Sequence, residues 1–341
     1  MTSGHRVALS RRSLLWAAAA STLAGCATPR PPQPPQSATG SPSSASSTGA
    51  TSPGGTPSSQ AAPPVDVEPY AVLPGEVEPA CKLAAVRALE AALTWRDGAS
   101  GLEAAQERLV ALGVPATAPA SLAPLLEDGA WSSLRITYPQ YGGLLADTSE
   151  ASVMIAAERL SAVDAGRSPE SLTVDTRLVR RGDAWQVTEQ ALALPAPAAP
   201  GLTDAARAVL DHDRIDLPAA ARADVEAGIV DDLVLSMLAG LAEQWRVSVL
   251  VFTSGHPLNV FGTDRQSNHT RGRAVDIWAI DDVPVIDRAR SPWREVMEAA
   301  AALGSDEIGG PKDLDGVRGR RPYFADHVHQ DHLHLGFEPQ G

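Results

Sequence analysis

The sequence of 341 residues predicts an α+β protein with two folded units, residues 68–194 and residues 202–341. In the first unit, two segments with apolar residues at helical spacing precede four segments rich in β-forming residues. In the second unit, helical and strand-like segments alternate, and a strand-like segment closes the chain. Residues 195–201 between them are rich in proline and alanine, a composition typical of a short, semi-rigid linker.

The elements of the first unit follow from its apolar spacing. Helices are expected at residues 83–95 and 102–112, and Gly113 favours an end to the second helix. Four strands are expected after them, at residues 134–141, 152–159, 171–179 and 185–190. The Arg-Arg-Gly-Asp sequence at 180–183 predicts a hairpin turn between the last two strands. This order resembles the small nuclear-transport-factor-type (NTF2-like) domains, in which helices cover a curved antiparallel sheet.

The second unit is expected to begin with helices and to end with a sheet. Thr203 is a candidate N-cap for a helix to residue 210, and Asp231 or Asp232 for a helix to residue 245. A third helix, with Pro292 in its first turn, is expected to run to residue 303. Strands are expected at residues 247–252, 273–280 and 332–337, with the last two as candidates for neighbours in one antiparallel sheet.

The first 25 residues have the pattern of a secretory signal peptide. Arginines 6, 11 and 12 precede an apolar run at residues 14–24, which is too short to cross a bilayer. The run ends in Leu-Ala-Gly-Cys26, which resembles the bacterial lipobox, whose cysteine becomes the lipid-modified first residue. The paired arginines resemble a twin-arginine export signal, and an ordinary positive leader is the alternative. We therefore expect an extracytoplasmic lipoprotein, anchored to the membrane through Cys26.

Residues 26–67 predict a disordered tether, because a stretch of Pro, Ser, Thr, Gly and Ala buries too little apolar surface to fold. The net charge of the chain is −13, and loss of three leader arginines leaves 25 basic against 41 acidic residues. This balance excludes nucleic acid as an expected partner, since phosphate binding needs clustered Lys and Arg. With Cys26 lipidated, Cys81 has no disulfide partner and is expected to be packed in the core.

Candidate metal-binding residues gather near the end of the chain. Six of its eight histidines lie between residues 256 and 334. Side chains alternate between the faces of a strand, so His332 and His334 share one face of the closing strand. If that strand pairs with the strand at 273–280, Asp276 and His334 meet on the face opposite the apolar residues. His269 can fold back to the same point across a turn at Gly272, which gives two imidazoles and one carboxylate around one position.

These motifs resemble those of the zinc D,D-peptidases and related cell-wall endopeptidases, with hedgehog domains as distant relatives. The shared pattern is Ser-x-His followed after six residues by Asp, and a late His-x-His. In this chain the pattern is carried by Ser267, His269, Asp276, His332 and His334. The likeness covers roughly residues 202–336 and includes the Arg271-Gly272 pair found in the dipeptidases. It implies a hedgehog/D,D-peptidase-like domain with a central antiparallel sheet.

The resemblance also implies roles for individual residues. His269, Asp276 and His334 correspond to the Zn²⁺ ligands of these enzymes, and Asp331 takes the place of the general base. A murein endopeptidase family shares the spacing of His329, His332 and His334. The proton acceptor is therefore expected to be Asp331, with His332 and His329 stabilising the water or the oxyanion. The imidazoles themselves are the alternative.

One departure from the family concerns the oxyanion. Many of these enzymes have Ser-Gly-x-Arg upstream, whereas this chain has Ser-Gly-His256-Pro. Arg265, Arg271 or Arg273 is expected to replace the missing arginine. Ser267 is expected to hydrogen-bond near the metal ligands, and Arg271, Arg273 and His256 are expected close to the substrate or behind the ligands.

The resemblance implies a membrane-anchored zinc metallopeptidase, a carboxypeptidase or an endopeptidase, that hydrolyses peptidoglycan stem peptides or crosslinks. Zn²⁺ is its expected cofactor, and peptidoglycan peptides and the membrane are its expected partners. Because the upstream arginine is missing, a zinc-binding, non-catalytic cell-wall scaffold lipoprotein is the alternative. Zinc content does not separate these two hypotheses, but hydrolysis of wall fragments does.

Overall fold

The computed structural model describes residues 63–127, 129–162, 169–317 and 319–339. The expected signal peptide, the expected lipidation site Cys26 and nearly all of the expected tether lie outside these residues. Within the described part of the chain, no helix combines the length and the apolar character needed to span a bilayer.

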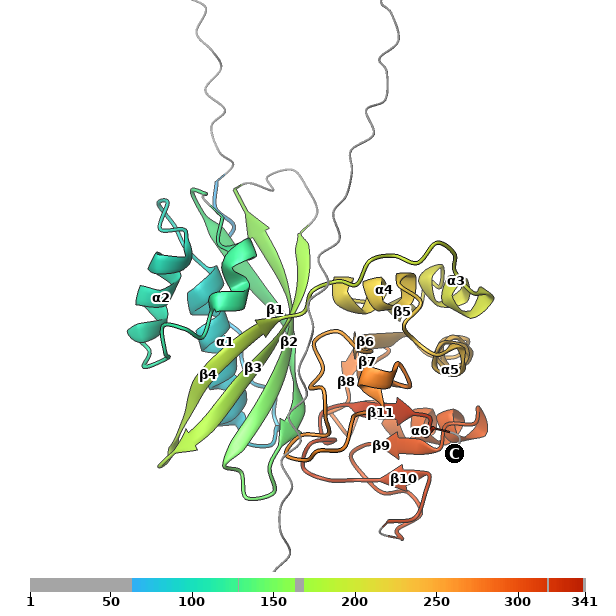
Figure 1. Ribbon diagram of the computed structural model, residues 1–341. Helices are drawn as coiled ribbons and strands as arrows, with labels where there is room; N and C mark the ends of the chain where they lie inside the picture. The colour runs from blue at the N-terminus through green and yellow to red at the C-terminus, as the bar shows by residue number, and fades with distance from the viewer. Residues whose placement is uncertain (1–62, 128, 163–168, 318, 340–341) are drawn as a thin grey trace, which may run out of the picture. The chain divides into compact units, whose positions relative to one another are not determined.

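The first part of the described chain is a four-stranded antiparallel sheet with helices packed against it (Figure 1). Its helices are α1 (Pro79–Leu93), α2 (Leu102–Val110) and the 3-10 helix η1 (Ala120–Leu125). Its strands are β1 (Ser132–Leu144), β2 (Glu150–Ser161), β3 (Glu170–Arg181) and β4 (Ala184–Leu192), in the spatial order β1-β2-β3-β4. The expected two helices and four strands are confirmed, and Gly182, with φ 62°, makes the expected turn between β3 and β4.

Helix α1 buries its apolar side against all four strands and forms the first hydrophobic core with them. Cys81 lies in this core with no exposed surface. Burial raises the pKa of its thiol to about 12, so almost no thiolate forms at neutral pH.

We expect the Cys81 thiol of the native protein to react with a disulfide reagent roughly a thousandfold more slowly than the same thiol in urea, because the thiolate is the nucleophile. The measurement uses a Cys26→Ser variant, which leaves Cys81 as the one thiol of the chain. Rapid native labelling at pH 8 would contradict this packing.

The second part of the described chain forms a mixed sheet with helices around it (Figure 1). Its helices are α3 (Asp204–Leu210), α4 (Ala219–Glu226), α5 (Asp232–Ala242), the 3-10 helix η2 (His269–Arg271) and α6 (Trp293–Ala302). Its strands are β5 (Ile215–Asp216), β6 (Val247–Val251), β7 (Ala274–Ile280), β8 (Val283–Pro284), β9 (Glu307–Gly309), β10 (Tyr323–Phe324) and β11 (Leu333–Gly336). The strand order is β10-β9-β11-β7-β6-β5, and β8 pairs with β7.

Three helices and three strands of this part were expected and are present, but α5 ends at Ala242 rather than residue 245, and Pro292 is the N-cap of α6 rather than part of its first turn. Thr203 caps α3 by accepting the amide of Ala206, and Asp231, rather than Asp232, caps α5 by accepting the amide of Leu233. Helix α4 and the short strands β5, β8, β9 and β10 were not expected. Strands of two or three residues are too short for an alternating pattern to be detected.

The two sheets belong to one compact unit and are in direct contact. The ring of Tyr138 from β1 stacks on Trp278 from β7, with centroids 4.9 Å apart. Met154 of β2 and Leu250 of β6 are buried in the same small apolar cluster. Polar residues of β1 therefore lie close to the face of β7 that carries Asp276.

Candidate metal centre

Asp276 and His334 lie opposite each other on β7 and β11. The antiparallel register aligns His334 with Asp276 and, one position away, Leu333 with Ile277. Because side chains alternate, Leu333 and Ile277 point to the other face, where they are fully buried in the second core. This is the strand pairing that the alternation of residues predicted.

His269 reaches the same point from the turn η2. The turn ends at Gly272, whose φ of 71° lies in the left-handed region. A Cβ atom at this position would lie 1.9 Å from the carbonyl oxygen of Ile229, so a side chain does not fit. The hydroxyl of Ser267 accepts the backbone amide of His269 at 3.2 Å. These local constraints direct His269 toward Asp276.

Three atoms of these residues form a nearly equilateral triangle. His269 Nε2 is 3.0 Å from His334 Nδ1 and 3.1 Å from Asp276 Oδ1. His334 Nδ1 is 3.2 Å from Asp276 Oδ1. In a tetrahedral site with metal–ligand distances of about 2.1 Å, ligand atoms lie roughly 3.4 Å apart. Small side-chain movements thus suffice for these atoms to hold a dication, with the fourth position open.

Hydrogen bonds on the far side of both imidazoles orient them toward this triangle. His269 Nδ1 donates to the carbonyl oxygen of Phe252 at 2.6 Å, which leaves Nε2 with its lone pair. His334 Nε2 lies 3.2 Å from Glu307 Oε2 and donates to it. Glu307 is held in turn by the side-chain amide of Asn268 at 2.6 Å. Such contacts fix the tautomer and the ring orientation of metal-binding histidines.

Asp276 is ionised although it is buried. Burial by itself would raise the pKa of this carboxyl, but electrostatic interactions with His269 and His332 and hydrogen bonds with His269 and His334 hold it well below the usual range. Its second oxygen, Oδ2, accepts the side-chain amide of Gln140 at 2.6 Å. One oxygen is therefore engaged by the protein, and the other belongs to the triangle.

The hydrogen bonds of His334 favour its protonated form. Burial would lower its pKa, but hydrogen bonds to Asp276 and Glu307 outweigh burial and raise the pKa to about 10. Burial would likewise raise the pKa of Glu307, yet its hydrogen bond and charge interaction with His334 lower it to about 2. A positive charge is thus favoured where a metal ion would lie, and a dication would displace this proton.

His256 offers a second candidate set of ligands. Ligand atoms of His256, His269 and Asp276 all lie within 4.8 Å of one another, so these three residues can also hold a metal ion. However, the ring of His256 stacks on that of His269, with centroids 4.0 Å apart and planes inclined by 16°. The in-plane lone pairs of nearly parallel rings do not converge well on one ion. The ring of His334, in contrast, is inclined by 66° to that of His269, and its Nδ1 lies 3.0 Å from His269 Nε2. The set with His334 is therefore the better one.

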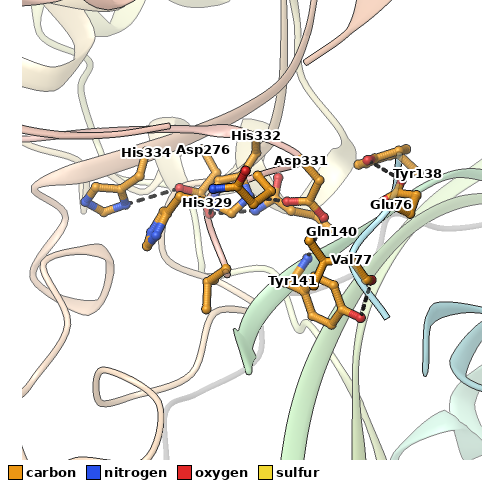
Figure 2. Close-up of polar contacts among 12 residues, drawn as sticks. Glu76, Val77, Tyr138, Gln140, Tyr141, Asp276, His329, Asp331, His332 and His334 are labelled. Atoms are coloured by element: carbon orange, nitrogen blue, oxygen red, sulfur yellow. Dashed lines mark hydrogen bonds and ion pairs between the residues drawn. The ribbon is translucent and has the colours of Figure 1, made fainter. Parts of the chain in front are cut away.

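Two imidazoles beside the triangle are each paired with a carboxylate, and Figure 2 shows the pair of His332 and Asp331. His332 Nδ1 donates to Asp331 Oδ1 at 2.6 Å, and its Nε2 lies 3.7 Å from Asp276 Oδ2. His329 Nδ1 donates to Asp326 Oδ1 at 2.7 Å, and its ring centroid is 5.1 Å from that of His332. In both pairs Nε2 is the nitrogen left to exchange a proton with a substrate.

The two imidazoles differ in proton affinity. Burial would lower the pKa of His332, but the charge of Asp276 and the hydrogen bond with Asp331 outweigh it, so the pKa is raised. Burial lowers the pKa of His329 in spite of its partner Asp326. His332 is therefore the stronger proton acceptor of the two.

Asp331, the expected general base, has both oxygens engaged. Oδ1 accepts from His332, and Oδ2 accepts the ammonium of Lys82 at 2.5 Å and the backbone amide of Tyr141 at 3.2 Å. Burial by itself would raise the pKa of Asp331, but Lys82 and His332 lower it. Asp331 also does not border the cavity described next. These contacts favour the alternative in which an imidazole accepts the proton and Asp331 orients it.

A cavity of about 480 Å³ opens beside the triangle. Its wall includes His332, His329 and the candidate ligands, and Ser267 also borders it. Strand β1 contributes a continuous stretch from Tyr141 to Leu144. The other lining residues are Ala146, Val260, Phe261, Phe324 and Val328, with His256, Arg265, Asn268, Glu307, Asp326 and His327. The cavity therefore leads directly to the three residues of the triangle.

The expected roles of two arginines are corrected by their contacts. Arg273 donates to Asp231 at 2.9 Å and to the carbonyl oxygen of Phe337 at 3.0 Å. Arg271 is exposed and donates to Gln266 at 3.3 Å. Neither arginine borders the cavity. Of the three candidate arginines, Arg265 is the one that borders the cavity.

Four residues of the site were not expected from the sequence. Glu307 and Asp326 hold His334 and His329, while Gln140 and Lys82 come from the first sheet and its helix. Only Lys82 had a detectable signal, because it is a charged residue on the apolar side of α1.

Comparison of the chain with protein-family models, with curated proteins and with solved structures gives no significant match.

Proposed function

We propose that this protein is a zinc metallopeptidase of the D,D-peptidase type. The observation that carries the proposal is the triangle of His269, Asp276 and His334, with ligand atoms 3.0–3.2 Å apart and a cavity on its open side. Two imidazole nitrogens and one carboxylate oxygen suit zinc better than magnesium or calcium, which prefer oxygen alone. The antiparallel pairing of β7 with β11 supports a hedgehog/D,D-peptidase-like fold for residues 202–341.

Zinc in such a site lowers the pKa of water toward neutrality and polarises the carbonyl of the scissile bond. In the proposed mechanism, Nε2 of His332 takes the proton of the attacking water while its Nδ1 stays bonded to Asp331. When the C–N bond breaks, His332 returns that proton to the leaving amine. Arg265 and His329, both on the cavity wall, stabilise the negative charge on the carbonyl oxygen.

The sequence resemblance supplies the substrate class, the peptides of the bacterial cell wall. We propose the extracytoplasmic face of the membrane as the location of the enzyme, with a lipid on Cys26. The tether expected from the composition of residues 26–67 would give the folded part access to wall peptides at some distance from the membrane.

We expect the purified protein to contain about one zinc ion per chain and to cleave wall muropeptides. Elemental analysis measures the metal, and mass spectrometry of the products shows whether terminal D-alanine is released or a crosslink is split. A strong chelator should abolish cleavage, and added zinc should restore it.

Two outcomes would count against this proposal. A protein that takes up no zinc after incubation and dialysis would have no metal centre. A protein that holds zinc but cleaves no wall fragment would favour the non-catalytic scaffold.

A further inference from the structure

We infer that the first sheet and its helix form part of the metal centre itself, with Gln140 and Lys82 as positioning residues. This inference rests on the proposed function, because it assumes that the triangle of His269, Asp276 and His334 holds zinc. Figure 2 shows Gln140 beside Asp276, His332 and Asp331, while its backbone belongs to β1.

Gln140 makes a contact that packing does not explain. Its side chain is fully buried, and Nε2 donates to Asp276 Oδ2 at 2.6 Å. Its Oε1 has no hydrogen-bond partner among the described residues. Around it the two sheets meet through apolar side chains such as Tyr138 and Met154. An apolar residue would stabilise this packing between the two sheets better, because a buried amide loses its hydrogen bonds to water. The amide is therefore best explained by its bond to Asp276.

The bond from Gln140 controls how Asp276 meets a metal ion. With Oδ2 engaged, Oδ1 alone turns toward His269 and His334, at 3.1 and 3.2 Å. Without that bond the carboxylate is free to rotate and to offer both oxygens. Hydrogen bonds behind metal ligands commonly change affinity by about 10- to 100-fold.

Lys82 acts on the same site through Asp331. Its ammonium, fully buried, bridges Asp331 Oδ2 at 2.5 Å and a carboxylate oxygen of Glu76. The backbone amide of Tyr141 donates to the same oxygen of Asp331. Asp331 then holds Nδ1 of His332, so α1 and β1 together set the orientation of this imidazole. A histidine whose orientation is fixed in this way exchanges protons from a defined position.

The test is a Gln140→Met variant of the whole protein, because methionine has a similar volume and lacks the N–H donor. We expect its zinc affinity to fall about 10- to 100-fold in competition with a chromophoric chelator. We also expect the visible absorption bands of the cobalt(II)-loaded variant to shift, since the coordination by Asp276 changes. Neither measurement depends on peptide hydrolysis.

Gln190→Met provides the matched control. Gln190 is buried in β4 of the same sheet, opposite Thr176 of β3, and its side-chain amide has no hydrogen-bond partner among the described residues. This variant should keep the zinc affinity and the cobalt spectrum of the unchanged protein. Circular dichroism and thermal unfolding of both variants establish that they are folded. If Gln140→Met does not fold, Gln140→Asn, which retains the amide but is too short to reach Asp276, replaces it with the same expected loss.

The outcomes separate the inference from the proposed function. Zinc affinity and a cobalt spectrum like those of the unchanged protein in a folded Gln140 variant would overturn the inference, even if the protein is an active peptidase. An equal loss in Gln190→Met would also overturn it, because the effect would then be general. If the unchanged protein binds neither zinc nor cobalt, the proposed function itself fails.

Discussion

Replacing His332 with alanine is expected to lower peptide turnover by about 10²- to 10⁴-fold while zinc stays bound. His332 lies on the cavity wall, and its Nε2 is 3.7 Å from Asp276 Oδ2, beside the triangle rather than in it. Its removal takes away the proposed proton acceptor and leaves His269, Asp276 and His334 in place. We therefore expect kcat to fall and KM to change little.

Turnover of a muropeptide and zinc content are measured on the same preparations of this variant. His212→Ala is the control, because His212 borders neither the cavity nor the triangle and contacts Asp213 and Glu243 instead. It should keep full activity. Two results together would assign the role of proton acceptor to Asp331 instead. They are full turnover in His332→Ala, and no turnover in an Asp331→Asn variant that is folded and holds zinc.

The convergence of His269, Asp276 and His334 could be predicted because each step of it is local. Alternation along two strands assigns Asp276 and His334 to the face opposite the apolar residues. A glycine at position 272 permits the turn that brings His269 back, and a side chain there would collide with Ile229. The apolar faces then leave one antiparallel register in which both strands bury their core residues.

The surroundings of these ligands could not be predicted in the same way. Gln140 lies 136 positions from Asp276 in the sequence, and Lys82 lies 249 positions from Asp331. Their roles depend on how two sheets pack, and no local pattern encodes that packing. The family spacing gave the position of Asp331, but only the structure reveals that Lys82 and Tyr141 occupy its second oxygen. The sequence therefore did not predict which residues pair with the buried carboxylates of Asp276 and Asp331.

Replacing Lys82 with methionine is expected to lower the free energy of unfolding by about 3–5 kcal/mol at neutral pH, because removal of one member of a buried ion pair leaves uncompensated charge. Lys82 is fully buried between Glu76 and Asp331. Burial raises the pKa of Glu76 even with Lys82 present. Without the ammonium, two carboxyl groups remain in the interior with no cation between them.

The pH dependence of this loss distinguishes charge from packing. In the unchanged protein, burial would raise the pKa of Asp331, but Lys82 and His332 lower it, so its contribution to stability is present at neutral pH and lost in acid. In the variant, Lys82 no longer offsets the burial of either carboxyl group, and proton uptake stabilises the folded state. The stability deficit should therefore shrink as the pH falls from about 8 to about 5.

Urea unfolding of both proteins with a chelator present measures this deficit without a contribution from bound metal. Lys312→Met is the control, because Lys312 is the other lysine of the chain and is exposed, so its loss should cost about 0.5 kcal/mol or less. A deficit in Lys82→Met that stays constant across this pH range would mean that lost packing, rather than unpaired carboxylates, causes it. A deficit as small as that of Lys312→Met would mean that Lys82 does not support Asp331. The proposal that Lys82 of α1 orients His332 through Asp331 would then be wrong.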